Sequence, residues 1–182
     1  MATKHAATRR PSELGFSLLE AAVVVAIVAI VGASALPSFT ALIDARRLDS
    51  AATRLAADLQ LARSEAIARN RPLRLSVGSG ADATCWVVHS GSATDCNCSA
   101  AGVACANGAL AIQSVVLPNA ERVGVAGNVA SIVFDPLHGT STPTATLSLS
   151  DARGRSVRHV VNVLGRVRSC SPLGTVAGYP AC

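Results

Sequence analysis

Aromatic residues are scarce in this sequence: they make up 3% of its 182 residues, with one tryptophan and one tyrosine. Hydrophobic residues account for 50%, mostly Ala, Val, Leu and Ile, which suit helices and small sheets packed without large side chains. A chain of this length accommodates one domain with terminal segments and argues against a second independent core. The scarcity of aromatics also argues against stacking on the bases of single-stranded nucleic acid.

Signatures of catalysis are missing as well. No nucleophile, general base and orienting acid occur together in a recognisable motif, and the glycine patterns that cradle phosphates are absent. His89, His138 and His159 stand singly, as structural histidines do. We interpret Trp86 as a core residue beside a disulfide. The sequence therefore indicates a protein that is not an enzyme and that has no catalytic residue, metal site or cofactor.

Ionisable side chains are almost absent between Leu14 and Phe39, where Glu20 stands alone. The apolar part of this segment is roughly 20 residues long, which is the length that a helix needs to cross the hydrocarbon core of a bilayer. Three Lys or Arg residues precede it within the first ten positions. Because positive charge beside a membrane span stays in the cytoplasm, we expect the rest of the chain on the opposite side.

The most distinctive pattern comes before the apolar run, as GFSLLE from Gly15 to Glu20, and the run ends at Pro37. This pattern resembles the N-terminus of type IV pilins and of the pseudopilins of type II secretion. The resemblance implies cleavage after Gly15 by a prepilin peptidase and methylation of the new N-terminus at Phe16. It also implies that Glu20 pairs with the terminal amine of a neighbouring pilin.

A carboxylate inside hydrocarbon is costly without such a partner, so the alternative for Glu20 is a position at the membrane interface. Beyond Pro37 the pattern remains helical, because apolar residues recur at steps of three and four from Leu48 to Ala66. The charged residues of this stretch fall mostly off the apolar stripe. We expect one helix over 16–70, bent or loosened near Pro37, with an amphipathic second half that ends before a proline.

After position 72 the apolar period changes to two and turn residues become frequent, which predicts antiparallel strands. The expected strands cover residues 73–77, 85–89, 110–117, 122–125, 131–134, 145–149 and 156–164. The stretch 90–107 has no period and is expected to be a loop held by disulfides. A helix followed by such strands predicts an α+β fold with the helix packed on an antiparallel sheet. The resemblance to pilins makes this the type IV pilin fold.

These features divide the chain into a cleaved prepilin leader, a transmembrane and filament-packing helix, an amphipathic helix of the head, and a β-rich periplasmic head with disulfides. The expected bounds are 1–15, 16–37, 38–70 and 71–182. The resemblance implies a single-pass protein of the bacterial inner membrane with its head in the periplasm. It also implies an extracellular location once the protein is assembled in a pilus with other major and minor pilins.

Six cysteines follow the apolar run: Cys85, Cys96, Cys98, Cys105, Cys170 and Cys182. An even number in a small exported domain predicts disulfides. The alternative, a metal site, requires a second closely spaced pair of ligands that the sequence lacks. Cys170 and Cys182 close a short loop rich in proline and glycine, so we expect them to pair. The other four are expected to pair among themselves, in an order that the spacing leaves open.

Positive charge is concentrated at the C-terminal end. Residues 136–182 contain five arginines against one acid, whereas residues 75–135 contain one arginine against four acids. The five arginines are Arg153, Arg155, Arg158, Arg166 and Arg168. Such a concentration attracts polyanions, although a run of charge is more often only solvated surface.

The segment Gly165-Arg166-Val167-Arg168 stands just before Cys170. Together with the N-terminal pattern it resembles the GspH/FimT family of minor pilins and pseudopilins, in which some FimT-type minor pilins of naturally competent bacteria bind DNA through a C-terminal GRxR motif. The resemblance implies that Arg166 and Arg168 bind double-stranded DNA. In an extended segment both would point to one face while Val167 turns inward, and Gly165 would shape the turn.

Arg153, Arg155 and Arg158 would widen this patch if their side chains face the same way. The alternative for Arg166 and Arg168 is structural, with the two side chains pairing with Asp151 or binding carbonyls at the sheet edge. Three functions therefore remain open: a minor pilin that captures DNA for uptake in natural transformation, a structural minor pilin for pilus assembly, and a GspH-type pseudopilin of type II secretion.

Overall fold

The computed structural model of the chain describes residues 17–99 and 101–182, with the backbone alone at 34–38. The chain divides into two compact units, residues 1–40 and residues 41–182. One helix, α1 (Leu18–Arg69), contributes to both units and continues through Pro37 without a break. The expected helix is confirmed over these bounds.

In the first unit, the large apolar side chains of α1 are exposed, including Val23, Ile27 and Ile30. Among the residues that the structure describes, no helix is long and apolar enough to cross a membrane. The predicted membrane helix at 16–37 lies partly outside the described residues, and the predicted leader at 1–15 lies wholly outside them.

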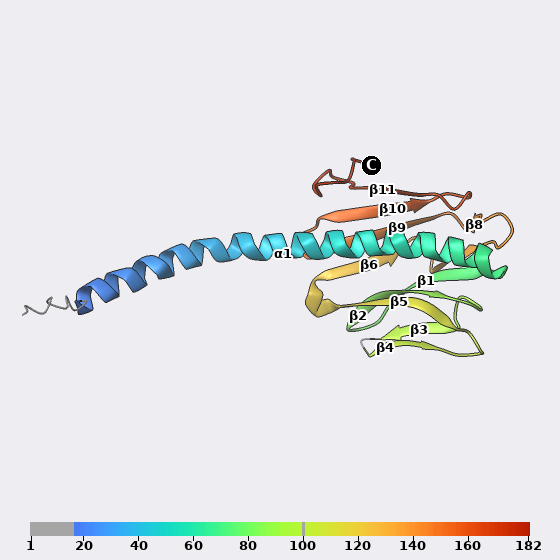
Figure 1. Ribbon diagram of the computed structural model, residues 1–182, viewed down its shortest axis with the longest axis horizontal. Coiled ribbons are helices and arrows are strands. Elements are labelled where there is room, and N and C mark those ends of the chain that lie inside the picture. Colours follow the sequence, from blue (N-terminus) through green and yellow to red (C-terminus); the bar gives the residue numbers. More distant parts are fainter. Residues whose placement is uncertain (1–16, 100) are drawn as a thin grey trace, which may run out of the picture. The chain divides into compact units, whose positions relative to one another are not determined.

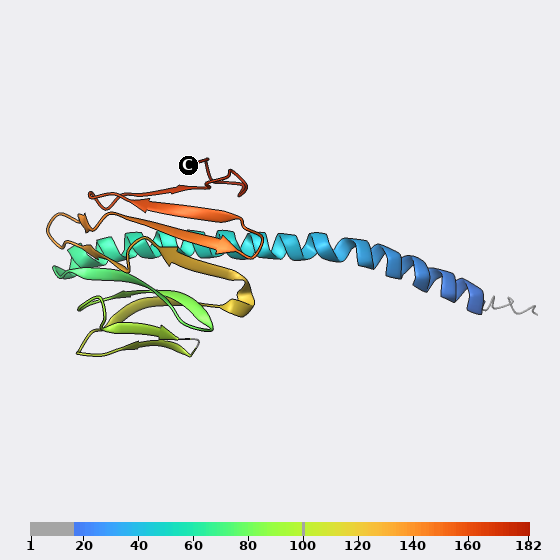
Figure 2. The ribbon, with the colours of Figure 1, turned by 180° about the vertical axis from the view of Figure 1, so that it is seen from behind.

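The second unit is the head, in which α1 packs on two antiparallel sheets (Figure 1). The five-stranded sheet has the order β5 (Ala111–Pro118), β2 (Ala83–His89), β1 (Leu73–Ser79), β7 (Ser131–Phe134) and β8 (Ser141–Thr142). The four-stranded sheet has the order β11 (Val167–Cys170), β10 (Ser156–Val161), β9 (Ala145–Asp151) and β6 (Val123–Gly127). In both views β10 and β11 lie on one side of the helix and β2 and β5 on the other (Figures 1 and 2). A short helix, η1 (Asn119–Glu121), connects β5 to β6.

The core of the head lies between α1 and the two sheets. The helix contributes the predicted apolar stripe, all fully buried: Leu48, Ala52, Leu55, Leu59, Ala62 and Ala66. On β2, Trp86 is also fully buried and its Nε1 donates a hydrogen bond of 2.6 Å to Asp58 Oδ2. Every buried member of the core cluster falls between Leu48 and Val176, so the head holds a complete core of its own.

The expectation of a loop over 90–107 is wrong for part of that stretch, although the disulfides expected to hold it are present. Within it, β3 (Cys96–Ser99) and β4 (Gly102–Cys105) pair as an antiparallel hairpin, with Cys96 directly opposite Cys105. The sequence shows no alternation there because a disulfide joins these two facing residues and little apolar surface is buried. A covalent bond therefore holds a hairpin whose side chains do not specify it.

The expected strand over 156–164 is wrong at its C-terminal end. β10 ends at Val161, the chain turns over residues 162–166, and β11 returns antiparallel to β10. Val163 and Leu164 continue the apolar pattern of the strand, but both are exposed in the turn. Gly165, with φ of +71°, allows the chain to reverse there.

The disulfide between Cys170 and Cys182 is confirmed, with their Cα atoms 5.0 Å apart. The remaining cysteines pair among themselves as expected, Cys85 with Cys98 and Cys96 with Cys105, and none is free. All three bonds lie within the head.

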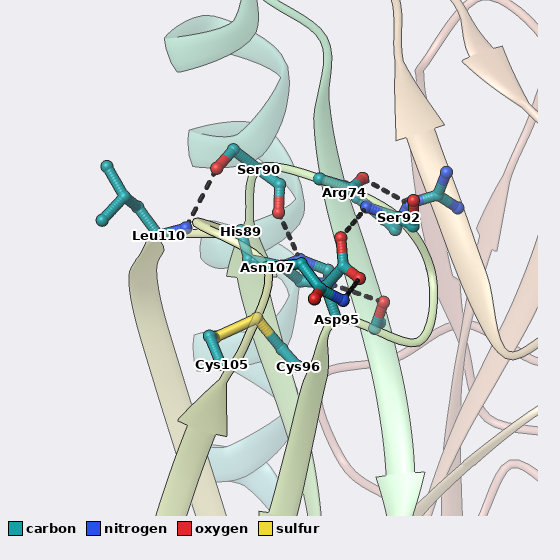
Figure 3. Close-up of a disulfide and its surroundings, with 11 residues drawn as sticks. Arg74, His89, Ser90, Ser92, Asp95, Cys96, Cys105, Asn107 and Leu110 are labelled. Carbon is teal, nitrogen blue, oxygen red and sulfur yellow. Dashed lines mark hydrogen bonds between the residues drawn. A yellow bond between two sulfur atoms is a disulfide. The ribbon is translucent and has the colours of Figure 1, made fainter.

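Figure 3 shows the Cys96–Cys105 disulfide beneath the loop that leads into the β3–β4 hairpin. Asp95 organises this loop: its carboxylate accepts hydrogen bonds from Asn107 Nδ2 at 2.9 Å and from the Ser92 backbone N–H at 2.6 Å. The Asn107 amide and then the Ser92 N–H lower the pKa of Asp95. These contacts give the loop and its acid a structural role.

Two of the three histidines considered above are buried in the sheets. His89 Nε2 lies 2.8 Å from Ser76 Oγ, and burial lowers its pKa. His159 Nδ1 lies 2.8 Å from Ser169 Oγ, and burial lowers its pKa to about 4. Both side chains are therefore neutral parts of the core at physiological pH.

Candidate nucleic-acid interface

Arg166 and Arg168 lie at the β10–β11 turn and on β11, which is an edge strand of its sheet. Both side chains are exposed, while Val167 between them is half-buried and packs on the core. This is the alternation expected of an extended segment. Among residues 17–99 and 101–182, no hydrogen bond or ion pair engages either guanidinium group.

Gly165 is held by close packing as well as by its turn conformation. A Cβ at this position would overlap the carbonyl oxygen of Gly139 and approach Arg63 Nε to 3.0 Å. Arg63, on α1, donates from Nε to the same Gly139 oxygen at 2.8 Å. The glycine of the motif therefore lets the β10–β11 turn sit against the helix and the β7–β8 turn.

Hydrogen bonds fix the rest of this turn. Asn162 bridges it, because its Oδ1 accepts the Arg166 N–H at 3.0 Å and its own N–H donates to the Arg166 carbonyl at 3.1 Å. Ser141 on β8 donates from Oγ to the Asn162 carbonyl at 2.6 Å and from N–H to the Val163 carbonyl at 2.9 Å. The two arginines thus project from a rigid support.

Arg158 on β10 is exposed on the same face of the sheet as Arg168. Arg168 lies opposite Val160 and Arg158 lies opposite Cys170, so the two arginines are separated by one step of the two-residue period. His159, between Arg158 and Val160, points into the core. Of the three arginines considered as extensions of the patch, Arg158 is the one that this face accommodates.

Arg153 and Arg155 belong to the β9–β10 turn, at the other end of β10, and both are engaged. Arg153 Nε lies 3.1 Å from Asp44 Oδ2, and this hydrogen bond lowers the pKa of Asp44. Arg155 Nη2 lies 2.6 Å from Asp151 Oδ2. Asp151 is therefore the partner of Arg155 and not of the arginines of the β10–β11 turn.

The processing residues are described only in part. Gly15 and Phe16 lie outside the described residues, whereas Glu20 occupies the first turn of α1 with an exposed side chain. Elsewhere in the described chain, no cluster of three His, Cys, Asp or Glu side chains is arranged to hold a metal ion.

The support of the patch could not be found from the sequence. Arg63 and Gly139 are 76 residues apart, and neither belongs to a recognisable motif. The one sequence feature that pointed to this support was a glycine at position 139. Like Gly165, Gly139 has a positive φ and lies so close to neighbouring atoms that a Cβ would not fit.

Comparisons with known proteins identify the family. Among solved structures, the chain is similar to the crystal structure of the type IV minor pilin FimU of Pseudomonas aeruginosa, with 21% identity and a TM-score of 0.47, over 66% of this chain and 86% of that one. A search of curated proteins finds no match. The family model described as type II transport protein GspH matches residues 51–165. That match covers well over half of the chain, and the protein therefore belongs to the GspH family of type II transport proteins.

Proposed function

We propose that this protein is a minor pilin that binds double-stranded DNA through Arg166 and Arg168 and so serves DNA uptake in natural transformation. Family membership supports the general part of this proposal, namely that the protein is a minor pilin or pseudopilin without enzymatic activity. The proposal that the protein binds DNA rests on a pair of exposed arginines that have no partner among the described residues. They lie beside a turn that is fixed by Gly165 and Asn162.

Arginine suits this role because its planar guanidinium donates paired hydrogen bonds to phosphate and keeps its charge at every physiological pH. Contacts of this kind position a protein on DNA without reading bases, so binding is expected to be insensitive to sequence. A few phosphate contacts give dissociation constants of roughly 10⁻⁴ to 10⁻⁶ M at physiological salt. Firm capture would therefore require several heads in one filament.

In the proposed arrangement, a prepilin peptidase cleaves after Gly15, Phe16 becomes the methylated N-terminus, and residues 16–37 anchor the chain in the inner membrane. Glu20 then pairs with the terminal amine of a neighbouring pilin in the filament. The exposed apolar side chains of the first unit support such a role, because they require an apolar environment. The three disulfides support a head on the oxidising, periplasmic side.

A pseudopilin of a type II secretion system is the second candidate, because the matching family is described as a type II transport protein. In that function the exposed arginines of β11 would only solvate the head, as they would in a purely structural minor pilin. Binding of DNA separates the first candidate from both alternatives.

The test is duplex binding by the head, residues 41–182, which contains the whole core cluster and all three disulfides. We expect weak binding at low salt that the double variant Arg166→Gln, Arg168→Gln reduces at least tenfold. The matched control is Arg46→Gln with Arg54→Gln, which removes the same charge from exposed positions on α1. A wild-type head that does not bind, or a folded double variant that binds as well as wild type, would overturn the proposal in favour of a structural role.

A further inference from the structure

Four large apolar side chains are exposed at the end of the head that contains the β10–β11 turn. They come from α1, the β7–β8 turn and the β10–β11 turn, and their exposed fractions range from 47% to 74%: Ile67, Leu137, Val163 and Leu164. We call these four side chains the apolar tip. None of them belongs to the core cluster of the head.

Close packing brings the three segments together. A Cβ on Gly139, two residues after Leu137, would lie 2.9 Å from Ile67 Cδ1. The Gly139 carbonyl packs against Gly165, the residue after Leu164. The tip therefore gathers side chains from distant parts of the sequence on one rigid support.

Positive charge lies beside the tip, on Arg166. Arg166 follows Leu164 by two positions and has no partner among the described residues. The nearest acid of the β7–β8 turn, Asp135, is occupied locally: its Oδ1 accepts the backbone N–H groups of Leu137 at 3.0 Å and His138 at 2.9 Å. Those N–H groups and the His138 side chain lower the pKa of Asp135. An apolar surface thus borders directly on positive charge that a ligand can reach.

We propose that the apolar tip lies against the deoxyribose faces of the duplex whose phosphates Arg166 and Arg168 bind. This inference rests on the proposed function. A DNA strand alternates charged phosphates with sugars whose carbon faces are apolar, so aliphatic side chains beside arginines complement it without reading bases. The surface then has two parts, of which only the arginines release counterions.

Substitutions in the apolar tip and substitutions of the arginines should therefore change the salt dependence of DNA binding differently. Removing the apolar side chains lowers affinity at every salt concentration but leaves the slope of log K against log salt unchanged. Removing an arginine reduces the slope, by roughly 0.9 for each phosphate that the protein no longer neutralises. Sequence-independent contact with sugar also means that the loss of affinity is the same for duplexes of different base composition.

The experiment is a titration of a short fluorescent duplex with the head at several salt concentrations. We expect Val163→Ser with Leu164→Ser to weaken binding about three- to tenfold with an unchanged salt slope, and Leu137→Ser alone to weaken it less. Leu173→Ser is the matched control, because Leu173 is 74% exposed in the loop after β11. Its affinity should equal that of wild type.

Each outcome decides the inference. If the Val163 and Leu164 variant and the Leu137 variant bind as wild type while the arginine variant does not, the apolar tip has no part in DNA binding and the proposed function stands. The same holds if the Leu173 control loses as much affinity as the tip variant. If the wild-type head does not bind duplex at all, the proposed function and this inference both fail.

Discussion

A pair of arginines separated by one residue lies at each end of β10, and the two pairs interact with the rest of the head in opposite ways. In the β9–β10 turn, Arg153 and Arg155 are held by Asp44 and Asp151. At the β10–β11 turn and on the following strand β11, Arg166 and Arg168 face solvent without a partner among the described residues. The same sequence spacing thus gives a structural link at one end of a strand and available charge at the other.

The difference follows from where acids lie. The β9–β10 turn begins with Asp151 and meets Asp44 on α1, whereas the β10–β11 turn meets Arg63 and the carbonyl of Gly139. A paired guanidinium stabilises the fold and is unavailable to a ligand, while an unpaired one costs the fold little and remains available.

The buried histidine of β10, the strand between the two turns, should make the stability of the head fall at acid pH. His159 on β10 is buried, and its pKa is lowered from the usual 6.5 to about 4. Because the unfolded chain binds a proton more readily, stability is complete above pH 6.5 and is lost as pH falls from 6.5 toward 4. The linked loss is about 3 kcal/mol.

Urea unfolding of the head at pH 7.5 and pH 4.5 measures this loss. In His159→Gln the pH dependence over that interval should be much smaller, whatever the stability of the variant at neutral pH. An undiminished pH dependence in the variant would assign the effect to other groups and would contradict the buried neutral state.

The glycines of the two turns should differ in the cost of a methyl group. Gly154 and Gly165 both have positive φ, of +80° and +71°, but a Cβ on Gly154 meets nothing within 4 Å, whereas one on Gly165 overlaps the Gly139 carbonyl. We expect Gly154→Ala to cost about 1 kcal/mol and Gly165→Ala about 2 to 4 kcal/mol. Chemical denaturation of the two variants measures the difference, and equal costs would show that the motif glycine serves only the turn.

The arginines themselves should differ in their effect on stability. Arg155→Gln removes an ion pair with a buried carboxylate and leaves Asp151 without its charged partner, for an expected loss of about 1 to 3 kcal/mol. Arg166→Gln removes no side-chain interaction among the described residues and should change stability by less than about 0.5 kcal/mol. Thermal unfolding of the two variants measures this. A destabilised Arg166→Gln head would indicate that this side chain has a structural partner.

Much of the fold could be predicted from local patterns. The apolar stripe of α1, the strands of the two sheets and the Cys170–Cys182 pair depend on residues that are close in sequence, or on a period that a single segment reveals. The β3–β4 hairpin was missed because its alternation is absent. The β10–β11 turn could not be predicted because Val163 and Leu164 continue the apolar pattern of the strand although both side chains are exposed.

The pairing of Arg153 and the support of the motif turn could not be predicted, because both depend on interactions between distant residues, whereas Arg155 pairs with Asp151 only four residues away. Asp44 and Arg153 are 109 residues apart, and Arg63 and Gly139 are 76 residues apart. Arg166 and Arg168 are exposed, as expected of an extended segment, but the sequence left open whether Arg153 and Arg155 face the same way. For Arg153 that question is settled by its contact with Asp44 on α1, which depends on how the sheet packs on the helix.

In the proposed function, the presentation of the arginines, and not their number, decides DNA binding. The direct test compares two folded double variants of equal charge in duplex titrations over a range of salt: Arg166→Gln with Arg168→Gln, and Arg153→Gln with Arg155→Gln. The first should bind at least tenfold more weakly and with a salt slope smaller by about two units, because two phosphates are no longer neutralised. The second should retain the salt slope of the wild-type head and nearly all of its affinity. Equal effects in the two variants, or a greater effect in the second, would contradict the claim.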